Sequence, residues 1–140
     1  MAQRRRQSNV LARTDSLYIA PSRVNGHGVF AAKPFAESET IEVCPVLAVT
    51  ADEWEHLEDT RLRGHYFVWG KGVALALGYG SLYNHSWQPN ARYDADYDLA
   101  VISFTALRDI RRGEELTVNY CGEPDAVGEL WFDAGAPPPA

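Results

Sequence analysis

The feature that most constrains the fold is a succession of short β-favouring apolar runs, none of them long enough for a buried helix. Glycine, proline and polar turn residues interrupt these runs. In the first half of the chain they are LYIA (17–20), GVFAA (28–32), IEV (41–43), VLAVT (46–50), YFVW (66–69) and VALAL (73–77). This pattern predicts a mainly β domain with many short strands.

Two further patterns complete the predicted elements. Thr50 and Glu53 fit a capping box, so a short helix, ADEWEHLED (51–59), is expected to follow, with Trp54 and Leu57 on its inner face. ARYD (91–94) and LAVISFTA (99–106) predict a hairpin across residues 95–98, and LTVNY (116–120) predicts a last strand. One or two short helices are therefore expected beside the sheets.

The 140 residues suit one domain. Residues 1–15, which carry Arg4, Arg5, Arg6 and Arg13, are expected to form a disordered basic arm, and residues 134–140 a disordered proline-rich tail. Residues 16–133 are expected to form the folded domain. No run of 18 apolar residues occurs, so no membrane partner is expected.

The charge is unevenly distributed along the chain. From residue 16 onward there are 9 basic and 18 acidic residues, a net charge of −9. An acidic body disfavours nucleic acid as a direct ligand and favours a basic peptide or a cationic ligand. Two well-separated cysteines, Cys44 and Cys121, indicate a reducing compartment, so we predict an intracellular and cytoplasmic location.

Several types of functional site are excluded, because the sequence lacks the residues or the spacing that they require. Residues 94–98 resemble the start of a calcium loop, but Leu99 stands where that loop needs glycine and Thr105 where it needs an acid. His85 and Ser86 are adjacent and lack the G-x-S-x-G elbow of a serine hydrolase. The histidines and cysteines lack the spacing of a zinc site, so no metal is expected.

Three separated stretches remain, and they belong together by order and spacing. They are GHGVFA (26–31), GYGSLYNHSWQPNARY (78–93) and GEELTVNY (113–120). Together they resemble the SET domain, a family of protein-lysine methyltransferases that use S-adenosyl-L-methionine. The resemblance runs from Tyr18 to Phe132 and is strongest to the minimal viral and bacterial members without zinc-binding flanking modules.

The resemblance implies a fold of the β-clip type. Several small sheets would surround a C-terminal pseudoknot, in which the last strand threads under a loop. Threaded topologies are rare, so composition alone does not suggest one. The polar stretch around Asn84 and His85 would lie at this crossing, where backbone groups without a regular ladder need side-chain partners.

The resemblance also implies which residues bind the cofactor. The loop of Gly26, His27, Gly28 and Val29 would contact its methionine end, since small residues let the main chain approach a ligand. Tyr83, Asn84 and His85 match further cofactor contacts. Trp131 lies in an apolar C-terminal segment and would stack on the adenine.

Catalysis, on the same resemblance, would depend on Tyr120, which would orient the lysine amine and the methyl group. Tyr66, Tyr120 and Phe132 would line the lysine channel. A neutral amine would displace the methyl group from the sulfonium, and an aromatic channel beside a cation would lower the pKa of the lysine. The substrate would be a lysine-containing protein, possible substrates including one with a basic tail. A second copy of the chain, forming a homodimer, is a further possible partner.

One departure and two alternatives accompany this interpretation. Many SET proteins have a zinc-binding cysteine where this chain has Trp87, so that zinc site is excluded. The chain could instead be a catalytically silent SET-like module that binds a peptide or the cofactor. It could also be an unrelated β-clip binding domain, although this alternative leaves NHSWQPN and GEELTVNY unexplained.

Overall fold

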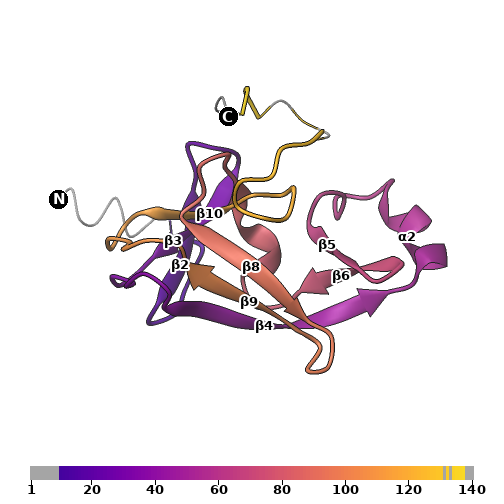
Figure 1. Cartoon of the computed structure of the whole chain (residues 1–140), viewed down its shortest axis with the longest axis horizontal. Helices are drawn as coiled ribbons and strands as arrows, with labels where there is room; N and C mark the ends of the chain where they lie inside the picture. The colour runs from indigo at the N-terminus through magenta and orange to yellow at the C-terminus, as the bar shows by residue number, and fades with distance from the viewer. Residues whose placement is uncertain (1–9, 131, 133, 138–140) are drawn as a thin grey trace.

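The computed structural model describes residues 10–130, 132 and 134–137. Within them, ten strands form two five-stranded sheets (Figure 1). The order in the first sheet is β1 (Ala12–Arg13), β2 (Leu17–Pro21), β3 (His27–Ala31), β10 (Glu115–Val118), β7 (Asn84–His85). The order in the second is β5 (Tyr66–Trp69), β6 (Gly72–Ala76), β4 (Thr40–Val49), β9 (Val101–Ala106), β8 (Ala91–Asp96). The prediction of a mainly β fold with many short strands is confirmed.

Strand β4 is longer than the sequence predicts because it changes partners at Pro45. Residues 40–45 pair with β9, and residues 46–49 pair with β6. Figure 1 shows β4 running from the side of β2 and β3 toward α2. The two predicted runs, 41–43 and 46–50, therefore form one strand, since a proline without N–H is tolerated where the pairing passes from one neighbour to another.

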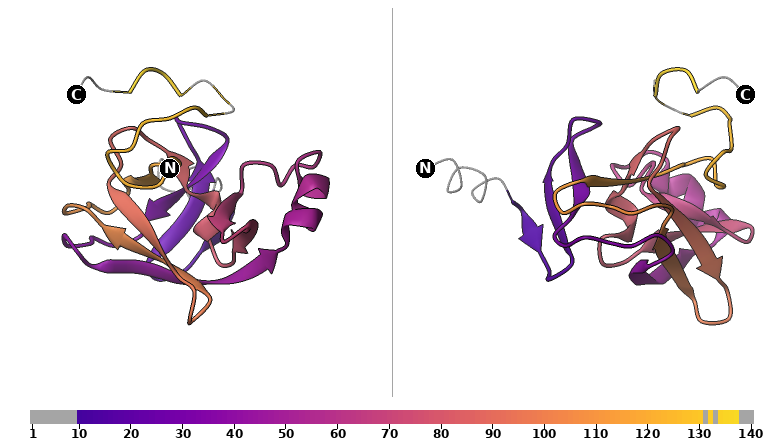
Figure 2. Two further views of the ribbon diagram at one scale, coloured as in Figure 1. Left: turned by 45° about the vertical axis from the view of Figure 1, so that its right-hand side comes forward. Right: turned by 60° about the vertical axis from the view of Figure 1, so that its left-hand side comes forward.

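Helix α2 (Ala51–Leu57) begins with the predicted capping box. The Thr50 hydroxyl accepts from the N–H of Glu53, and the Glu53 carboxylate accepts from the N–H of Thr50. The helix ends two residues earlier than predicted, and none of its residues is fully buried. Figure 2 shows α2 at the edge of the molecule. Its inner face thus covers a cavity rather than the core.

Two other predicted boundaries differ from the structure. The turn of the β8–β9 hairpin spans residues 97–100 instead of 95–98, and Ala100 adopts a left-handed conformation with φ of 54°. Ala12 and Arg13, within the predicted disordered arm, form β1 and pair with Ile19 and Tyr18. Residues 1–9 of that arm lie outside the described residues.

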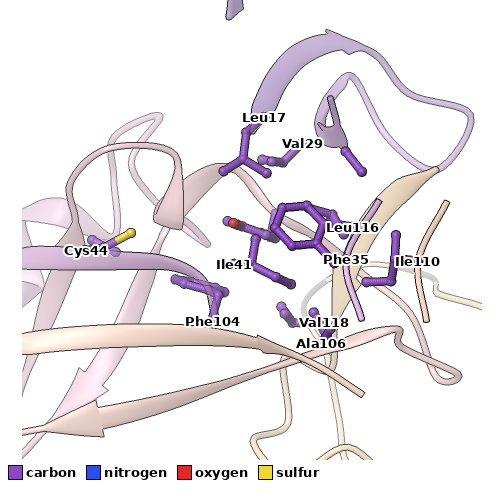
Figure 3. Close-up of a cluster of buried hydrophobic side chains, with 14 of the residues drawn as sticks. Leu17, Val29, Phe35, Ile41, Cys44, Phe104, Ala106, Ile110, Leu116 and Val118 are labelled. Carbon is purple, nitrogen blue, oxygen red and sulfur yellow. The ribbon is translucent and has the colours of Figure 1, made fainter. Parts of the chain in front are cut away.

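The core lies between the two sheets (Figure 3). Leu17, Val29, Leu116 and Val118 come from the first sheet, and Phe104, on β9, comes from the second. The Phe104 ring stacks on that of Tyr83, with 4.2 Å between centroids. The η1 turn (Gly80–Leu82) comes so close to the core that a Cβ on Gly80 would lie 2.8 Å from Cys44 Sγ. This packing fixes the chain immediately before Asn84.

None of the helices in the described part of the chain has the length and apolar composition to cross a membrane.

Candidate active site

The last strand brings the three separated stretches together. β10 lies between β3 and β7, with Leu116 opposite Val29 in antiparallel pairing and Val118 opposite His85 in parallel pairing. The N–H of Ser86 continues this pairing by donating to the carbonyl of Val118 (3.0 Å). A strand inserted between two much earlier segments is the crossing that the sequence predicts at Asn84 and His85.

Asn84 holds the β2–β3 loop against this crossing. Its side-chain nitrogen donates to the carbonyls of Asn25 (3.0 Å) and His27 (3.2 Å) and to the Glu115 carboxylate (3.1 Å). The residue is buried, so these acceptors replace the water that the amide would otherwise bind. Asn84 therefore fixes the main chain on both sides of Gly26.

Gly26 and Gly28, the two glycines of the predicted cofactor loop, are favoured at their positions for different structural reasons. Gly26 has φ of +47°, a conformation that favours glycine. Gly28 is required by space, because a Cβ there would lie 2.9 Å from both Asn84 Nδ2 and Glu115 Oε2. His27 is exposed, whereas the Val29 side chain is fully buried in the core. Val29 also pairs with Ile19 of β2 and Leu116 of β10, so its main chain lies within the sheet.

His85 has one satisfied and one unsatisfied ring nitrogen. Nδ1 accepts from the main-chain N–H of Tyr120 (3.0 Å), which assigns the proton of the neutral ring to Nε2. Nε2 is buried and has no hydrogen-bond partner among the described residues. Burial lowers the pKa of His85, so the ring is neutral at physiological pH. A buried N–H donor is thus left for a ligand.

The Tyr120 hydroxyl donates to the main-chain carbonyl of Tyr83 (2.5 Å). Burial is the main cause that raises the pKa of Tyr120 to about 12, and the negative charge of Glu115 contributes. The phenol therefore stays protonated across the physiological range and acts as a donor rather than a base.

Tyr83 contributes its main chain to this site, while its side chain belongs to the core. The hydroxyl donates to the Glu42 carboxylate (3.0 Å), and the ring stacks on Phe104. Burial first, and the Glu42 charge second, raise the pKa of Tyr83. The Tyr83 ring is therefore held in the core, and its main-chain carbonyl is the part that meets Tyr120.

Two cavities meet at Tyr120. One, the His27 cavity, has a volume of about 410 Å³ and is lined by Asn25, His27, Asn84 and His85. The other, the aromatic cavity, has a volume of about 490 Å³. Its ring-bearing walls are Trp54, Tyr66, Phe67, Tyr93, Tyr97 and Tyr120. Gly64 and His65 also line both cavities.

Tyr66 stands in the aromatic cavity with its hydroxyl fixed from α2. It donates to the Glu58 carboxylate, which also accepts from the indole N–H of Trp54 (2.7 Å). The Trp54 and Tyr66 rings meet edge to face, with 6.3 Å between centroids. Burial and the hydrogen bond to Glu58 raise the pKa of Tyr66. The structure thus joins Tyr66 to Tyr120, as predicted, through one cavity.

The two C-terminal residues predicted for the site have different outcomes. Phe132 lies edge to face with His85 (6.1 Å) and with Tyr120 (6.0 Å), and it lines the His27 cavity. Its described position is thus on the His27 side of Tyr120, while the sequence predicts it in the lysine channel. Trp131 lies outside the described residues. In both views of Figure 2 the chain after β10 lies on the same side as the β2–β3 loop.

Sequence reasoning did not assign a role to several residues of this region. Trp54 was expected only as an inner-face residue of its helix, and Phe67, Tyr93 and Tyr97 received no role. A signal does exist, because aromatic residues concentrate in the two strands, β5 and β8, and in the adjoining turn. Glu115 is part of the GEEL motif but was likewise unassigned.

No group of three or more metal-ligating side chains occurs in the part of the chain that the structure describes. At the position where many SET proteins have a cysteine, the Trp87 indole N–H donates to the carbonyl of Gly135 (3.0 Å). Its ring lies edge to face with His85, 4.3 Å between centroids. The C-terminal segment is thus held here by a hydrogen bond to Trp87.

Comparisons with known proteins agree with this geometry. The SET domain family model matches residues 26–121. A histone-lysine N-methyltransferase of Schizosaccharomyces pombe, specific for H3 lysine-37, is 38% identical over 119 residues, which are 84% of this chain and 77% of that protein.

Solved structures share the fold. A candidate histone methyltransferase of Plasmodium falciparum matches with a TM-score of 0.65 and 28% identity, over 85% of this chain and 98% of that one. Polycomb Repressive Complex 2 of Chaetomium thermophilum, bound to S-adenosylmethionine, matches in fold with a TM-score of 0.65 and 24% identity, over 75% of this chain and 15% of that one. The chain is therefore a member of the SET-domain family of S-adenosylmethionine-dependent protein-lysine methyltransferases.

Proposed function

We propose that the His27 cavity holds S-adenosylmethionine, that the aromatic cavity admits the lysine side chain, and that the two ligands meet at Tyr120. The observation that carries this assignment is that Tyr120 lines both cavities. Its hydroxyl and the Tyr83 carbonyl, 2.5 Å apart, provide two oxygen atoms at this junction.

The residues of the His27 cavity fit this cofactor. S-adenosylmethionine, when bound, supplies an electrophilic methyl group on a sulfonium and also carries an ammonium, a carboxylate and an adenine. The unsatisfied Nε2–H of His85 is a donor for one of its acceptor groups. Gly26, His27 and Asn84 line this cavity and would hold the methionine end, while Gly28, Val29 and Tyr83 adjoin them in the chain. Trp131 would stack on the adenine. Phe132, beside His85, would wall the same space.

The aromatic cavity would bind the lysine as a neutral amine. A free lysine has a pKa of about 10.4 and is mostly protonated at pH 7. Aromatic walls such as Tyr66 and a neighbouring sulfonium disfavour the ammonium form, so the pKa of the bound lysine falls. S-adenosylmethionine would supply its methyl group to this neutral amine, Tyr66 and Tyr120 would hold the amine in the aromatic cavity, and water would take up the proton that the product releases.

Tyr120 contributes by positioning rather than by taking a proton. Its raised pKa keeps the hydroxyl protonated, and its hydrogen bond to Tyr83 fixes its orientation. A small misplacement of reacting groups can cost on the order of a hundredfold in rate. Tyr120 is thus the catalytic residue of this proposal, and Tyr66 lines the lysine channel with it, while Phe132 belongs to the cofactor side.

The substrate is a lysine-containing protein, and we propose a basic, histone-like tail. The net charge of −9 beyond residue 15 favours such a partner, and the S. pombe relative acts on histone H3. An intracellular location fits this substrate and the free thiols of Cys44 and Cys121. A cytoplasmic location, a homodimer and the absence of direct nucleic-acid binding stay predictions.

The test is transfer of a labelled methyl group from S-adenosylmethionine to histone H3 and to peptides of its tail, with mass spectrometry to locate the modified lysine. A peptide with that lysine replaced by arginine keeps the charge and should accept no label. Cofactor binding without transfer to any lysine-rich protein would instead support the silent module. Failure of the cofactor to raise the melting temperature would contradict the assignment of the His27 cavity to S-adenosylmethionine.

A further inference from the structure

The Glu115 carboxylate joins two segments that line the His27 cavity. One oxygen accepts from the Ser22 hydroxyl (2.5 Å), and the other accepts from the Asn84 side-chain nitrogen (3.1 Å). Glu115 begins β10, where it pairs with Phe30 of β3. A single side chain therefore connects the loop after β2, the crossing at β7 and the last strand.

On the Ser22 side, this contact fixes the shape of the β2–β3 loop. The Ser22 hydroxyl accepts from the N–H of Val24 (2.9 Å), and the Ser22 N–H donates to the carbonyl of Gly26 (2.8 Å). Because the hydroxyl oxygen receives the Val24 N–H, its own hydrogen is directed to Glu115. Val24 and Asn25 line the His27 cavity, so the conformation of this loop determines the shape of that part of the cavity wall.

On the Asn84 side, the same carboxylate sets the direction of the amide. The nitrogen faces three acceptors, Glu115 and the carbonyls of Asn25 and His27. The amide oxygen consequently lies on the other side of the group, and Asn84 lines the cavity. An oxygen held in this way is an acceptor suited to a cationic ammonium.

The space between these groups is full. A Cβ at residue 28 would lie 2.9 Å from both the Glu115 carboxylate and the Asn84 amide, so only glycine fits. Two donors, the Ser22 hydroxyl and the Asn84 amide, point at the side chain of residue 115. A carboxylate can accept from both, because both of its oxygens are acceptors. Glutamine has nearly the same shape but would turn an NH₂ group toward one of those donors.

We infer that Glu115 is a positioning residue for the cofactor, acting through Asn84 and the Ser22–His27 loop and not by contact with the ligand. The inference rests on the proposed assignment of the His27 cavity to S-adenosylmethionine. Since it acts through the shape of the cavity, its loss weakens binding of the cofactor and of its product, S-adenosylhomocysteine, which lacks the sulfonium charge but keeps the ammonium and the carboxylate, alike. The lysine substrate, in the other cavity, is not affected.

The test is Glu115→Gln, with calorimetric Kd values for both ligands and steady-state KM values for cofactor and peptide. We expect about a tenfold weaker Kd for S-adenosylmethionine and for S-adenosylhomocysteine, a matching rise in the cofactor KM and an unchanged peptide KM. Glu114→Gln is the matched control, because Glu114 pairs with Arg108 (3.1 Å) and lies outside both cavities. It should keep wild-type Kd values.

Two further variants keep the inference testable if Glu115→Gln fails to fold. Ser22→Ala should weaken the binding of both ligands similarly, and Ser22→Thr should restore most of the affinity. Where Glu115→Gln does fold, combining it with Ser22→Ala should lose less than the sum of the single losses. The inference would be overturned by unchanged Kd values, by a lower melting temperature without a change in Kd, or by a loss of affinity for S-adenosylmethionine alone. Failure of the wild-type protein to bind either ligand would instead overturn the proposed cofactor site.

Discussion

A single hydroxyl group, that of Tyr120, stands where the two cavities join. We expect Tyr120→Phe to lower kcat about a hundredfold, because the ring keeps its place and the positioning hydrogen bond to Tyr83 is lost. The variant should bind S-adenosylmethionine with little change in Kd. Single-turnover methyl transfer and calorimetry measure the two effects, and wild-type turnover would remove Tyr120 from catalysis.

The pH dependence of the rate follows from the same residue. The pKa of Tyr120 is raised to about 12, so its hydroxyl does not titrate between pH 7 and 9. The group that titrates is the substrate lysine, whose neutral fraction grows about tenfold per pH unit well below its pKa. We expect kcat/KM for the peptide to rise from pH 7 toward pH 9, and a flat profile would contradict attack by the neutral amine.

His85 predicts a second pH effect, on stability. Burial lowers its pKa in the folded protein, while the unfolded chain keeps a value near 6.5. The unfolded state therefore binds more protons below pH 6.5, so the contribution of His85 is complete above pH 6.5 and is lost as pH falls through the folded pKa. Urea unfolding of wild type and His85→Gln between pH 7.5 and 5 should show a smaller decrease for the variant. Equal decreases would exclude His85 as the cause.

At the scale of elements, α2 depends on its cap because none of its residues is buried. Thr50→Ala removes the capping box and should lower the free energy of unfolding by about 1 kcal/mol. Since α2 carries Trp54 into the aromatic cavity, the peptide KM should rise while the cofactor Kd stays unchanged. Thr50→Ser keeps the hydroxyl and is the control. Equal peptide KM values for both variants would show that α2 does not shape the channel.

The elements also show what local sequence signals can predict. The capping box at Thr50 and the strands β5 and β6 form as expected, because their determinants lie within a few residues of each other. Continuity of β4 through Pro45 was not predictable, because it depends on two partner strands that are distant in the chain. The same holds for Glu115, whose role appears only once Ser22 and Asn84 lie beside it.

At the scale of the molecule, the site was predictable through resemblance and not through composition. Asn84, His85 and Tyr120 lie in motifs whose order identifies a SET domain, and the structure brings them together. Nothing local in LTVNY shows that this strand would enter between β3 and β7. Nor does any periodicity show that the Tyr83 ring turns into the core while its carbonyl faces Tyr120.

We also expect the folding of the protein and its methyl transfer to need no bound metal ion. Trp87 and Gly135 provide the hydrogen bond that holds the C-terminal segment, and the described residues contain no metal-ligating cluster. We expect millimolar EDTA to leave both the melting temperature and the rate of methyl transfer unchanged. A SET enzyme with zinc modules is the comparison, since chelators unfold structural zinc sites. A loss of either property here would reveal a metal requirement.

The insertion of β10 between β3 and β7 has a consequence for biosynthesis. Both neighbours leave the ribosome well before β10 does, and neither Val29 nor His85 has its β10 partner until that late strand arrives. Pairing between such distant segments is slow because a long loop must close first. In a nascent chain Tyr120 therefore lies away from the proposed cofactor cavity, and we expect methyl transfer to begin only after β10 has been translated and has paired.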